Sequence, residues 1–372
     1  MPPTTRAFYH PELDGLRFLA FMLVFIHNAH PVLSDTSLKL LSEYGWIGVD
    51  LFFCLSAYLI TRLLLMEAER DGGIDIRNFY IRRILRIWPL YFFYVAIGSL
   101  LVILSQGWST SLLKHLAGLS TFTFNFAYFL LLPSPILLFV HLWTISYEEQ
   151  FYAVIPWFLG KVLTRGEGSK WNVLGLLLLL GTALRALFIY LGLEHPAIYI
   201  LPFTHFEAIL GGLAIGLGLF DRPLQNAAGP ALMLPAILCL GAVFLLPNND
   251  VTGWGLMLTY PLVGLGMSLI VFWAVDRTHP LLTRIIGNRV FVYLGKISYG
   301  LYVFHFGTLG LAARICSNIL GITLEQAALF RLTSLTIGMV LTVSFSALSY
   351  RWIERPFLKL KDRFSAVRSR PI

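Results

Sequence analysis

Segments of about twenty predominantly apolar residues, long enough to cross a bilayer as helices, recur along nearly the whole chain. Charges, proline or glycine separate them. Within lipid no water can satisfy the backbone N–H and C=O groups, so each segment must form its own helix. Only 13% of the 372 residues are charged, against roughly 25% in a soluble domain, and 57% are hydrophobic. The sequence therefore predicts an all-α, polytopic membrane protein.

We expect about ten transmembrane helices. They lie near residues 17–35, 46–66, 89–106, 141–160, 171–192, 197–219, 230–247, 253–275, 291–313 and 326–350. If the N-terminus is cytoplasmic, most of the 28 lysines and arginines fall in cytoplasmic segments. The positive-inside rule therefore predicts that both termini face the cytoplasm.

The chain shows no internal repeat and no segment with the composition of a soluble domain. We therefore expect a single membrane domain over residues 1–372, with no appended soluble domain. The N-terminal segment lacks the apolar core and cleavage site of a signal peptide, so the first helix should stay in the mature chain. Residues 107–140 are expected to form an external connection, either interfacial or re-entrant. The last helix should end at Pro356, because a proline disfavours helical geometry in the residue before it.

The net charge of +8 and the pI near 9.4 raise the question of a nucleic-acid partner. The basic residues are scattered over loops rather than gathered in one stripe or tail, so no nucleic-acid partner is expected. Cys54, Cys239 and Cys316 lie in separate apolar segments without a CxxC pair or a His/Cys cluster. These cysteines are expected to be buried, and no metal site is predicted.

Ionisable residues at membrane depth are candidates for function, because a charge in hydrocarbon costs about 2.5–3.5 kcal/mol. In LRFLAFMLVFIHNAH, Arg17 stands at the cytoplasmic entrance of the first expected helix. His27 follows about 15 Å further along the helix axis, with its side chain rotated by about 80° from that of Arg17. The two residues are therefore expected on the same helix, at different depths in the membrane.

The stretch HLWTISYEEQFYAVIPW places two carboxylates in another expected helix, which His141 opens. By the same helical rise, Glu148 and Glu149 lie near the bilayer midplane, at the depth of His27. Neighbouring side chains point about 100° apart, so only one glutamate is expected to face a given site. A glutamate bonded to His27 would raise its basicity as a general base. The same pair could instead serve only to hold two helices together.

Three further groups remain open between two interpretations. Arg83 and Arg86 recur at helical spacing in RNFYIRRILRIWPLY and fit either a lipid-facing interfacial helix or a phosphate site. In YLGKISYGLYVFHF, Tyr299 and His305 could contact a substrate, or His305 could be a buried core histidine. Asp50, in GVDLFFCLSAYLITR, is expected to be structural.

Six phrases, in this order along nearly the whole chain, carry a family resemblance: HPELDGLRFLAFMLVFIH, GVDLFFCLSAYLITR, FYIRRILRIWPLYF, HLWTISYEEQFYAVIPW, YLGKISYGLYVFHF and YRWIERPF. Together they resemble the acyltransferase-3 family of integral-membrane acyltransferases. The resemblance implies a ten-helix membrane domain. It also implies acyl-CoA as a cytoplasmic donor, with acetyl-CoA favoured, and a hydroxyl acceptor such as a cell-envelope glycan. The expected location is the bacterial inner membrane.

The resemblance also implies roles for individual residues. Arg17 and the pair Arg83 and Arg86 match the family's basic positions, where they would bind the donor. His27 matches its histidine and would act as general base, or would carry the acyl group as an intermediate. Family members commonly place ten residues between this arginine and histidine, whereas nine intervene here and Asn28 occupies the usual position.

The glutamate of the family's SxEEQFY phrase matches Glu148 or Glu149, with Glu148 preferred, as the group that orients the catalytic histidine. His305, Tyr299 and His141 are candidates for substrate contacts. A small-molecule acceptor is a second hypothesis, and a glycan transporter without chemistry is a third. The absence of matched helices broken by proline or glycine argues against a transporter.

Overall fold

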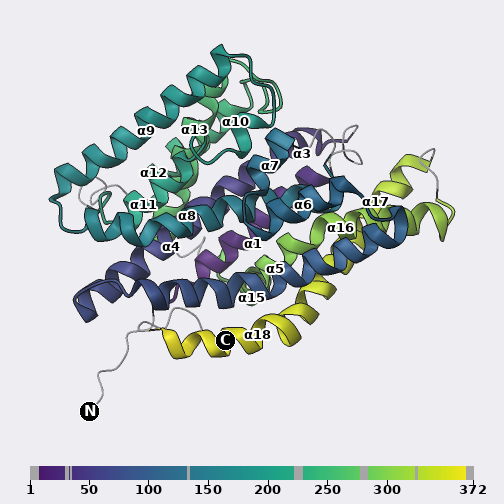
Figure 1. Cartoon of the computed structure of the whole chain (residues 1–372). Coiled ribbons are helices and arrows are strands. Elements are labelled where there is room, and N and C mark those ends of the chain that lie inside the picture. The colour runs from purple at the N-terminus through teal and green to yellow at the C-terminus, as the bar shows by residue number, and fades with distance from the viewer. Residues whose placement is uncertain are drawn as a thin grey trace.

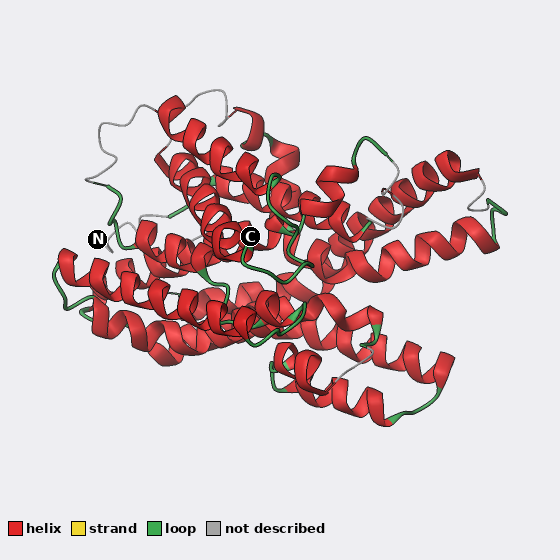
Figure 2. Cartoon of the chain, turned by 90° about the horizontal axis from the view of Figure 1, so that it is seen from above, coloured by secondary structure: helices red, strands yellow, loops and turns green. Residues whose placement is uncertain are grey.

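The computed structural model describes residues 8–29, 33, 36–131, 135–221, 229–276, 284–322 and 326–365. Within these ranges the chain contains helices, turns and loops but no strand (Figure 2). Five helical segments are long and apolar enough to cross a membrane: Ile47–Asp71, Ile76–Gln106, Glu167–Tyr190, Leu256–Val275 and Ala328–Phe364. An all-helical architecture with several candidate membrane-spanning helices, as predicted, is therefore confirmed for the described residues.

The order of the elements follows the expected order of apolar segments. The first half contains α1 (Pro11–Asn28), α3 (Lys39–Tyr44), α4 (Ile47–Asp71), α5 (Ile76–Gln106), α6 (Thr110–Ser120), α7 (Phe124–Leu131), η1 (Leu137–Leu142), α8 (Trp143–Val162) and α9 (Glu167–Tyr190). The second half contains α10 (Ala197–Ile200), α11 (Glu207–Gly216), α12 (Gly229–Val243), α13 (Leu256–Asp276), α15 (Arg289–Lys296), α16 (Ser298–Asn318), α17 (Ala327–Ser349), η3 (Tyr350–Glu354), α18 (Arg355–Lys361) and η4 (Asp362–Phe364).

Helix α4 forms the centre of the bundle and contacts α1, α8, α11 and α13. On one side, α9, α11, α12 and α13 form a group, whereas α5, α16, α17 and α18 lie on the other (Figure 1). Elements distant in sequence therefore meet around α1, α4 and α8. The predicted site residues lie mainly on α1, α5, α8 and α16, so the fold can bring them to this central region.

Small residues allow α4 and α11 to pack closely. A Cβ added to Gly212 would lie 2.8 Å from the Cβ of Ala57, and one added to Gly216 would lie 2.6 Å from the Cβ of Thr61. Both distances are shorter than real side-chain contacts. The spacing of four residues puts both glycines on one face of α11, as in helix pairs within membranes. This contact fixes the position of α4, which contributes to the central cavity described below.

The expected helix over residues 197–219 is wrong as a continuous span. The chain forms the four-residue α10, leaves helical geometry at Leu201 and resumes as the ten-residue α11. Pro202 explains the break, because it disfavours helical geometry in the preceding residue. At 1.5 Å per residue, α11 covers about 15 Å, half of the hydrocarbon core.

Two other boundaries differ from expectation. The basic segment and the third expected span form one 31-residue helix, α5, which runs through Pro89. The last helix does not stop at Pro356: a π-helical turn, η3, leads into α18, where Pro356 is the second residue. A proline is tolerated in the first turn of a helix because an N–H group there needs no helical partner.

The connection after α5 folds as the short helices α6 and α7 before η1 and α8. His115 of α6 is fully buried; its Nδ1–H donates to the Ser111 carbonyl at 2.7 Å, and its Nε2 accepts the Ile136 N–H at 2.8 Å. Burial lowers the pKa of the His115 imidazole, in agreement with this neutral form. The histidine thus ties α6 to the segment that leads into η1 and α8.

Candidate functional site

A cavity of about 140 Å³ lies among α1, α4, α5, α8, α16 and α18. Its lining brings together the three predicted donor-binding arginines from two helices, α1 and α5. The polar and charged lining residues include Asp14, Arg17, Ser56, Arg83, Arg86, Thr144, Glu148, Tyr299, Tyr302 and Lys361. The structure therefore places Glu148 and Tyr299 at the same cavity, as well as Lys361, which the sequence did not single out.

The arginines of this cavity are short of partners in the protein. Arg17 and Arg86 form no hydrogen bond or ion pair with any other described residue. The Nε atom of Arg83 is buried without a hydrogen-bond partner, and its guanidinium lies over the rings of Phe79 and Tyr152 at 5.6 and 5.7 Å. Among the described residues, four arginine or lysine side chains and two carboxylates line the cavity. Because partly buried cations are stabilised by counter-charges, the cavity is suited to an anionic ligand.

The two neighbouring glutamates have different surroundings. Glu148 faces the cavity, and its Oε1 accepts a hydrogen bond from the Ser56 hydroxyl at 2.8 Å. Glu149 is not part of the lining, and its Oε2 accepts a bond from the Trp88 indole at 3.3 Å. The expectation that only one glutamate faces a given site agrees with this geometry, and Glu148 is the one at the cavity.

A cluster of buried imidazoles lies beside Tyr302. The rings of His141 and His305 are 5.2 Å apart, and both side chains are buried. His305 donates from Nδ1 to the Tyr302 carbonyl at 2.5 Å, while its Nε2 lies 3.0 Å from Nδ2 of Asn28. His141 donates from Nε2 to the Val303 carbonyl at 3.0 Å, and its buried Nδ1 has no hydrogen-bond partner.

The expected bond between His27 and a glutamate is wrong. Nδ1 of His27 lies 2.8 Å from the carbonyl oxygen of Ser42, which can only accept, so this nitrogen carries the proton. Glu148 bonds to Ser56 instead. The expectation took His141 as the start of a helix, whereas His141 belongs to the 3-10 helix η1 and is buried beside His305. Glu148 lies seven residues further along, which is about 10 Å of helix.

Helical rotation explains why Asn28 rather than His27 faces His305. Asn28 lies eleven positions after Arg17, which is close to three full turns, so their side chains point within about 20° of each other. His27 is rotated by about 80°. Its Cβ lies close to Gly45, where an added Cβ would be 3.0 Å away, so His27 faces the segment between α3 and α4.

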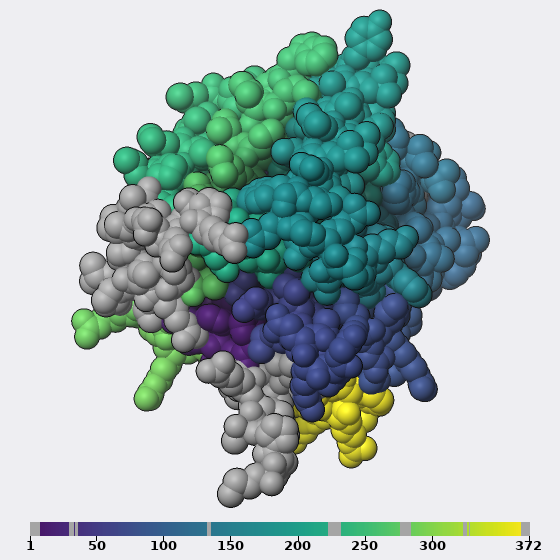
Figure 3. All heavy atoms as spheres, turned by 90° about the vertical axis from the view of Figure 1, so that its left-hand side faces the viewer, coloured from purple at the N-terminus to yellow at the C-terminus, as the bar shows by residue number. Residues whose placement is uncertain are grey.

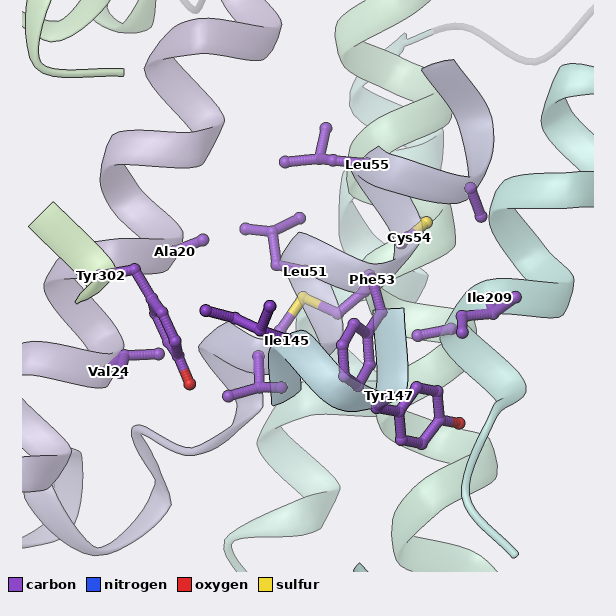
Figure 4. Packing of buried hydrophobic residues seen from close by; sticks show 14 of the residues in the cluster. Ala20, Val24, Leu51, Phe53, Cys54, Leu55, Ile145, Tyr147, Ile209 and Tyr302 are labelled. Atoms are coloured by element: carbon purple, nitrogen blue, oxygen red, sulfur yellow. The ribbon is translucent and has the colours of Figure 1, made fainter. Parts of the chain in front are cut away.

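Tyr302 lies between the cavity and the histidines. Its hydroxyl donates to the His141 carbonyl at 2.9 Å and accepts from the Thr144 hydroxyl at 2.7 Å. Figure 4 shows its ring beside Ala20 and Val24 of α1. Both Tyr302 and Thr144 also line the cavity. The side chain therefore contacts both parts of the candidate site.

Tyr299 lies one turn before Tyr302 on α16. Its hydroxyl donates to the backbone carbonyl of Ile87 at 2.8 Å, which connects α16 to α5. The predicted substrate candidates thus separate into two places: Tyr299 lines the cavity, whereas His141 and His305 lie in the histidine cluster.

Sequence reasoning missed several cavity residues, among them Ser56 and Lys361. Ser56 lies in a stretch of small residues on α4 and gives no signal of its own, yet it bonds Glu148. Lys361 follows Pro356, where the helix was expected to have ended, so no periodicity connected it with the arginines. A helix extended past Pro356 would have been needed to find it.

A second buried polar group lies between α4, α9 and the segment around α11. Asp50 Oδ1 lies 2.7 Å from His205 Nε2, and Arg185 Nη1 lies 2.6 Å from Glu207 Oε1. These contacts join neighbouring helices, in keeping with the structural role expected for Asp50. Among the described residues, no group of three or more His, Cys, Asp or Glu side chains is arranged to hold a metal ion.

The fold and this site define a multi-pass helical membrane protein with a basic cavity beside buried histidines. A family model for an acyltransferase domain matches residues 10–351, so the chain belongs to the acyltransferase-3 family. The resemblance noted in the sequence is thereby confirmed.

Curated relatives match 94% of the chain. A Staphylococcus aureus (strain MSSA476) protein provisionally named O-acetyltransferase SAS0844 is 28% identical over 380 residues, with 58% of its own length covered. The peptidoglycan O-acetyltransferase OatA of Listeria monocytogenes is 28% identical, with 56% covered. The provisionally named peptidoglycan O-acetyltransferase YrhL of Bacillus subtilis is 25% identical, with 55% covered. The chain thus spans little more than half the length of these relatives. No solved structure matches it.

Proposed function

We propose that this chain is an O-acetyltransferase that moves an acetyl group from acetyl-CoA to a hydroxyl of a cell-envelope glycan. Membership of the acyltransferase-3 family supports the reaction class. The names of the relatives support acetyl as the group and peptidoglycan as one acceptor. The observation that carries the proposal is the meeting of Arg17, Arg83 and Arg86 at one cavity.

The cavity would bind the donor through its phosphates. Guanidinium groups bind phosphate through paired N–H donors, which suits a ligand with several phosphates. The unpaired state of Arg17 and Arg86 supports this role, because a bound phosphate would supply the missing counter-charge. The thioester end of the donor would then extend past Glu148 and Tyr302 towards the histidines.

His27 would act as the general base. Because Nδ1–H is held by the Ser42 carbonyl, the lone pair of a neutral His27 ring is on Nε2. Nε2 would take the proton of the acceptor hydroxyl while its oxygen attacks the thioester carbonyl. The C–S bond then breaks, and the CoA thiolate takes the proton back from the imidazolium. Trapping an acetyl group on His27 after acid quenching would favour the alternative with an acyl-enzyme intermediate.

Two histidines and a carboxylate would support this step. His141 and His305 are proposed to contact the acceptor, and the unpartnered Nδ1 of His141 could accept a hydrogen bond from one of its hydroxyls. Glu148 would lie close to the donor at the inner end of the cavity, with Tyr299 as a further lining residue. Glu149 would have a structural role, because it accepts a hydrogen bond from the Trp88 indole and so joins α8 to α5.

The proposed topology has about ten membrane crossings in one domain, with both termini and the mouth of the basic cavity on the cytoplasmic side of the bacterial inner membrane. The excess of basic residues in the expected cytoplasmic segments supports this orientation. Cysteines introduced at Lys39 and Lys359 would test it. In intact cells an impermeant thiol reagent should label the first position and spare the second.

The acceptor is best tested in cells that carry and lack the gene. Mass spectrometry of their envelope glycans should show O-acetyl groups that depend on the gene and are lost in His27→Ala. Unchanged glycans together with an acetylated small metabolite would favour a small-molecule acceptor. Substrate movement across the membrane without release of CoA would support a transporter and contradict the proposal.

A further inference from the structure

We infer that Lys361, on the C-terminal helix α18, is a further donor-binding residue that contacts the 3′-phosphate of CoA. This inference rests on the proposed function, since it assigns one group of the proposed donor. The π-helical turn η3 carries the chain past α17, and the following helix α18 packs against α5.

Specific contacts hold the C-terminal segment against the bundle. Arg82 of α5 forms an ion pair with Glu67 of α4 at 2.6 Å and donates to the backbone carbonyl of Phe364 at 2.8 Å. Figure 3 shows the yellow C-terminal segment next to the blue segment where α4 ends and α5 begins. These contacts fix the position of η4 and, with it, the preceding residue Lys361.

The charged end of Lys361 is only weakly paired within the protein. Its Nζ lies 3.7 Å from Oδ1 of Asp362, near the limit of an ion pair, although the side chain is only 12% exposed. It lines the same cavity as Arg17, Arg83 and Arg86. A lysine placed among arginines at low exposure has the surroundings expected of an anion-binding group.

Contacts along α4 give the order of the two groups. Glu148 bonds to Ser56, near the middle of α4. Glu67, eleven positions or about 16 Å further along α4, pairs with Arg82, which also holds the carbonyl of Phe364, three residues after Lys361. Lys361 and Glu148 therefore lie towards different ends of the cavity, which Arg83 and Arg86 also line.

The donor has a matching order of groups. Its thioester is at one end, its diphosphate follows, and its 3′-phosphate lies on the ribose beyond the diphosphate. If the thioester points towards Glu148 and Tyr302, the arginines meet the diphosphate. Lys361 then meets the 3′-phosphate.

A comparison of two donors tests this assignment in the purified full chain in lipid. Acetyl-CoA and acetyl-3′-dephospho-CoA differ only in the phosphate assigned to Lys361. Lys361→Met, which keeps the length of the apolar stem, should raise KM about tenfold for acetyl-CoA. KM for the dephospho donor should stay unchanged, and kcat should change little for either. Lys361→Arg should retain most of the preference for acetyl-CoA over acetyl-3′-dephospho-CoA, because it keeps the positive charge.

Lys359 provides the matched control, because it lies on the same helix but is exposed and outside the cavity lining. Lys359→Met should leave both KM values unchanged. An unchanged KM for acetyl-CoA in Lys361→Met, or equal weakening of both donors, would overturn the assignment. In either case wild-type transfer from acetyl-CoA would show that the proposed function stands, whereas a wild-type chain without transfer from either donor would count against that function itself.

Discussion

Replacing Arg17 by methionine should make the empty protein more stable and donor binding weaker. Arg17 is partly buried beside Arg86, and it forms no hydrogen bond or ion pair with another described residue. An unpaired cation in such a place costs free energy, so we expect Arg17→Met to raise the free energy of unfolding by about 1 kcal/mol. If Arg17 held the fold together, the same substitution would instead lower the free energy of unfolding.

The same change should reduce the stabilisation that acetyl-CoA provides. A donor concentration of about 100 times Kd adds about 2.7 kcal/mol to the wild-type protein. Loss of one charge-assisted hydrogen bond, taken as about 1.4 kcal/mol, weakens binding about tenfold. At the same donor concentration the stabilisation then falls to about 1.4 kcal/mol.

Thermal unfolding of the purified protein, with and without acetyl-CoA, measures both effects. Arg62→Met is the control, because Arg62 lies on α4 but is exposed and outside the cavity lining. It should leave the acetyl-CoA-induced shift of Tm intact. A lower Tm for empty Arg17→Met combined with a full acetyl-CoA shift would refute the reasoning, since Arg17 would then be structural.

Three further predictions concern the packing, the carboxylates and the charge of the cavity. Gly212→Ala should lower the free energy of unfolding by about 1–3 kcal/mol through overpacking against α4, whereas Gly175→Ala, with nothing within 4 Å, should raise it by about 0.5–1 kcal/mol; chemical or thermal unfolding checks both. Glu148→Gln should lower kcat for acetyl transfer at least about tenfold, the effect of losing one charged hydrogen bond, while Glu149→Gln should keep most activity in the same assay. Raising the salt concentration from 0.1 to 1 M, which shortens the Debye length from about 10 to about 3 Å, should weaken acetyl-CoA binding in calorimetry, and a salt-independent Kd would argue against recognition by cations.

The sequence was informative where a feature depends on local periodicity. Apolar runs located the long helices, and helical spacing on α5 identified Arg83 and Arg86 as neighbours on one face. Arg17 could be added because its position at the end of an apolar run is costly unless it has a use. These arginines could be recognised from the sequence because the position of each depends on the periodicity of its own helix, and all three line one cavity.

Features that depend on how helices enter the bundle were not predictable in this way. Counting from expected helix ends gives Glu148 and His27 one depth, but the 3-10 helix η1 precedes α8, and Glu148 bonds to Ser56 and not to His27. The break at Pro202 and the continuation past Pro356 each depend on the surrounding packing, which can override the local tendency of a proline. Lys361 reaches the cavity only through that continuation.

The most direct test of the account is transfer of labelled acetyl from acetyl-CoA by the full chain reconstituted in lipid, with isolated envelope glycan as acceptor. Wild-type protein should release CoA only when acceptor is present, and the glycan should gain an equal amount of ester-linked label. A folded His27→Ala variant should still bind acetyl-CoA but should transfer no label. Full transfer by that variant would contradict the role of His27, and the absence of any acceptor-dependent CoA release by the wild-type chain would contradict the central claim.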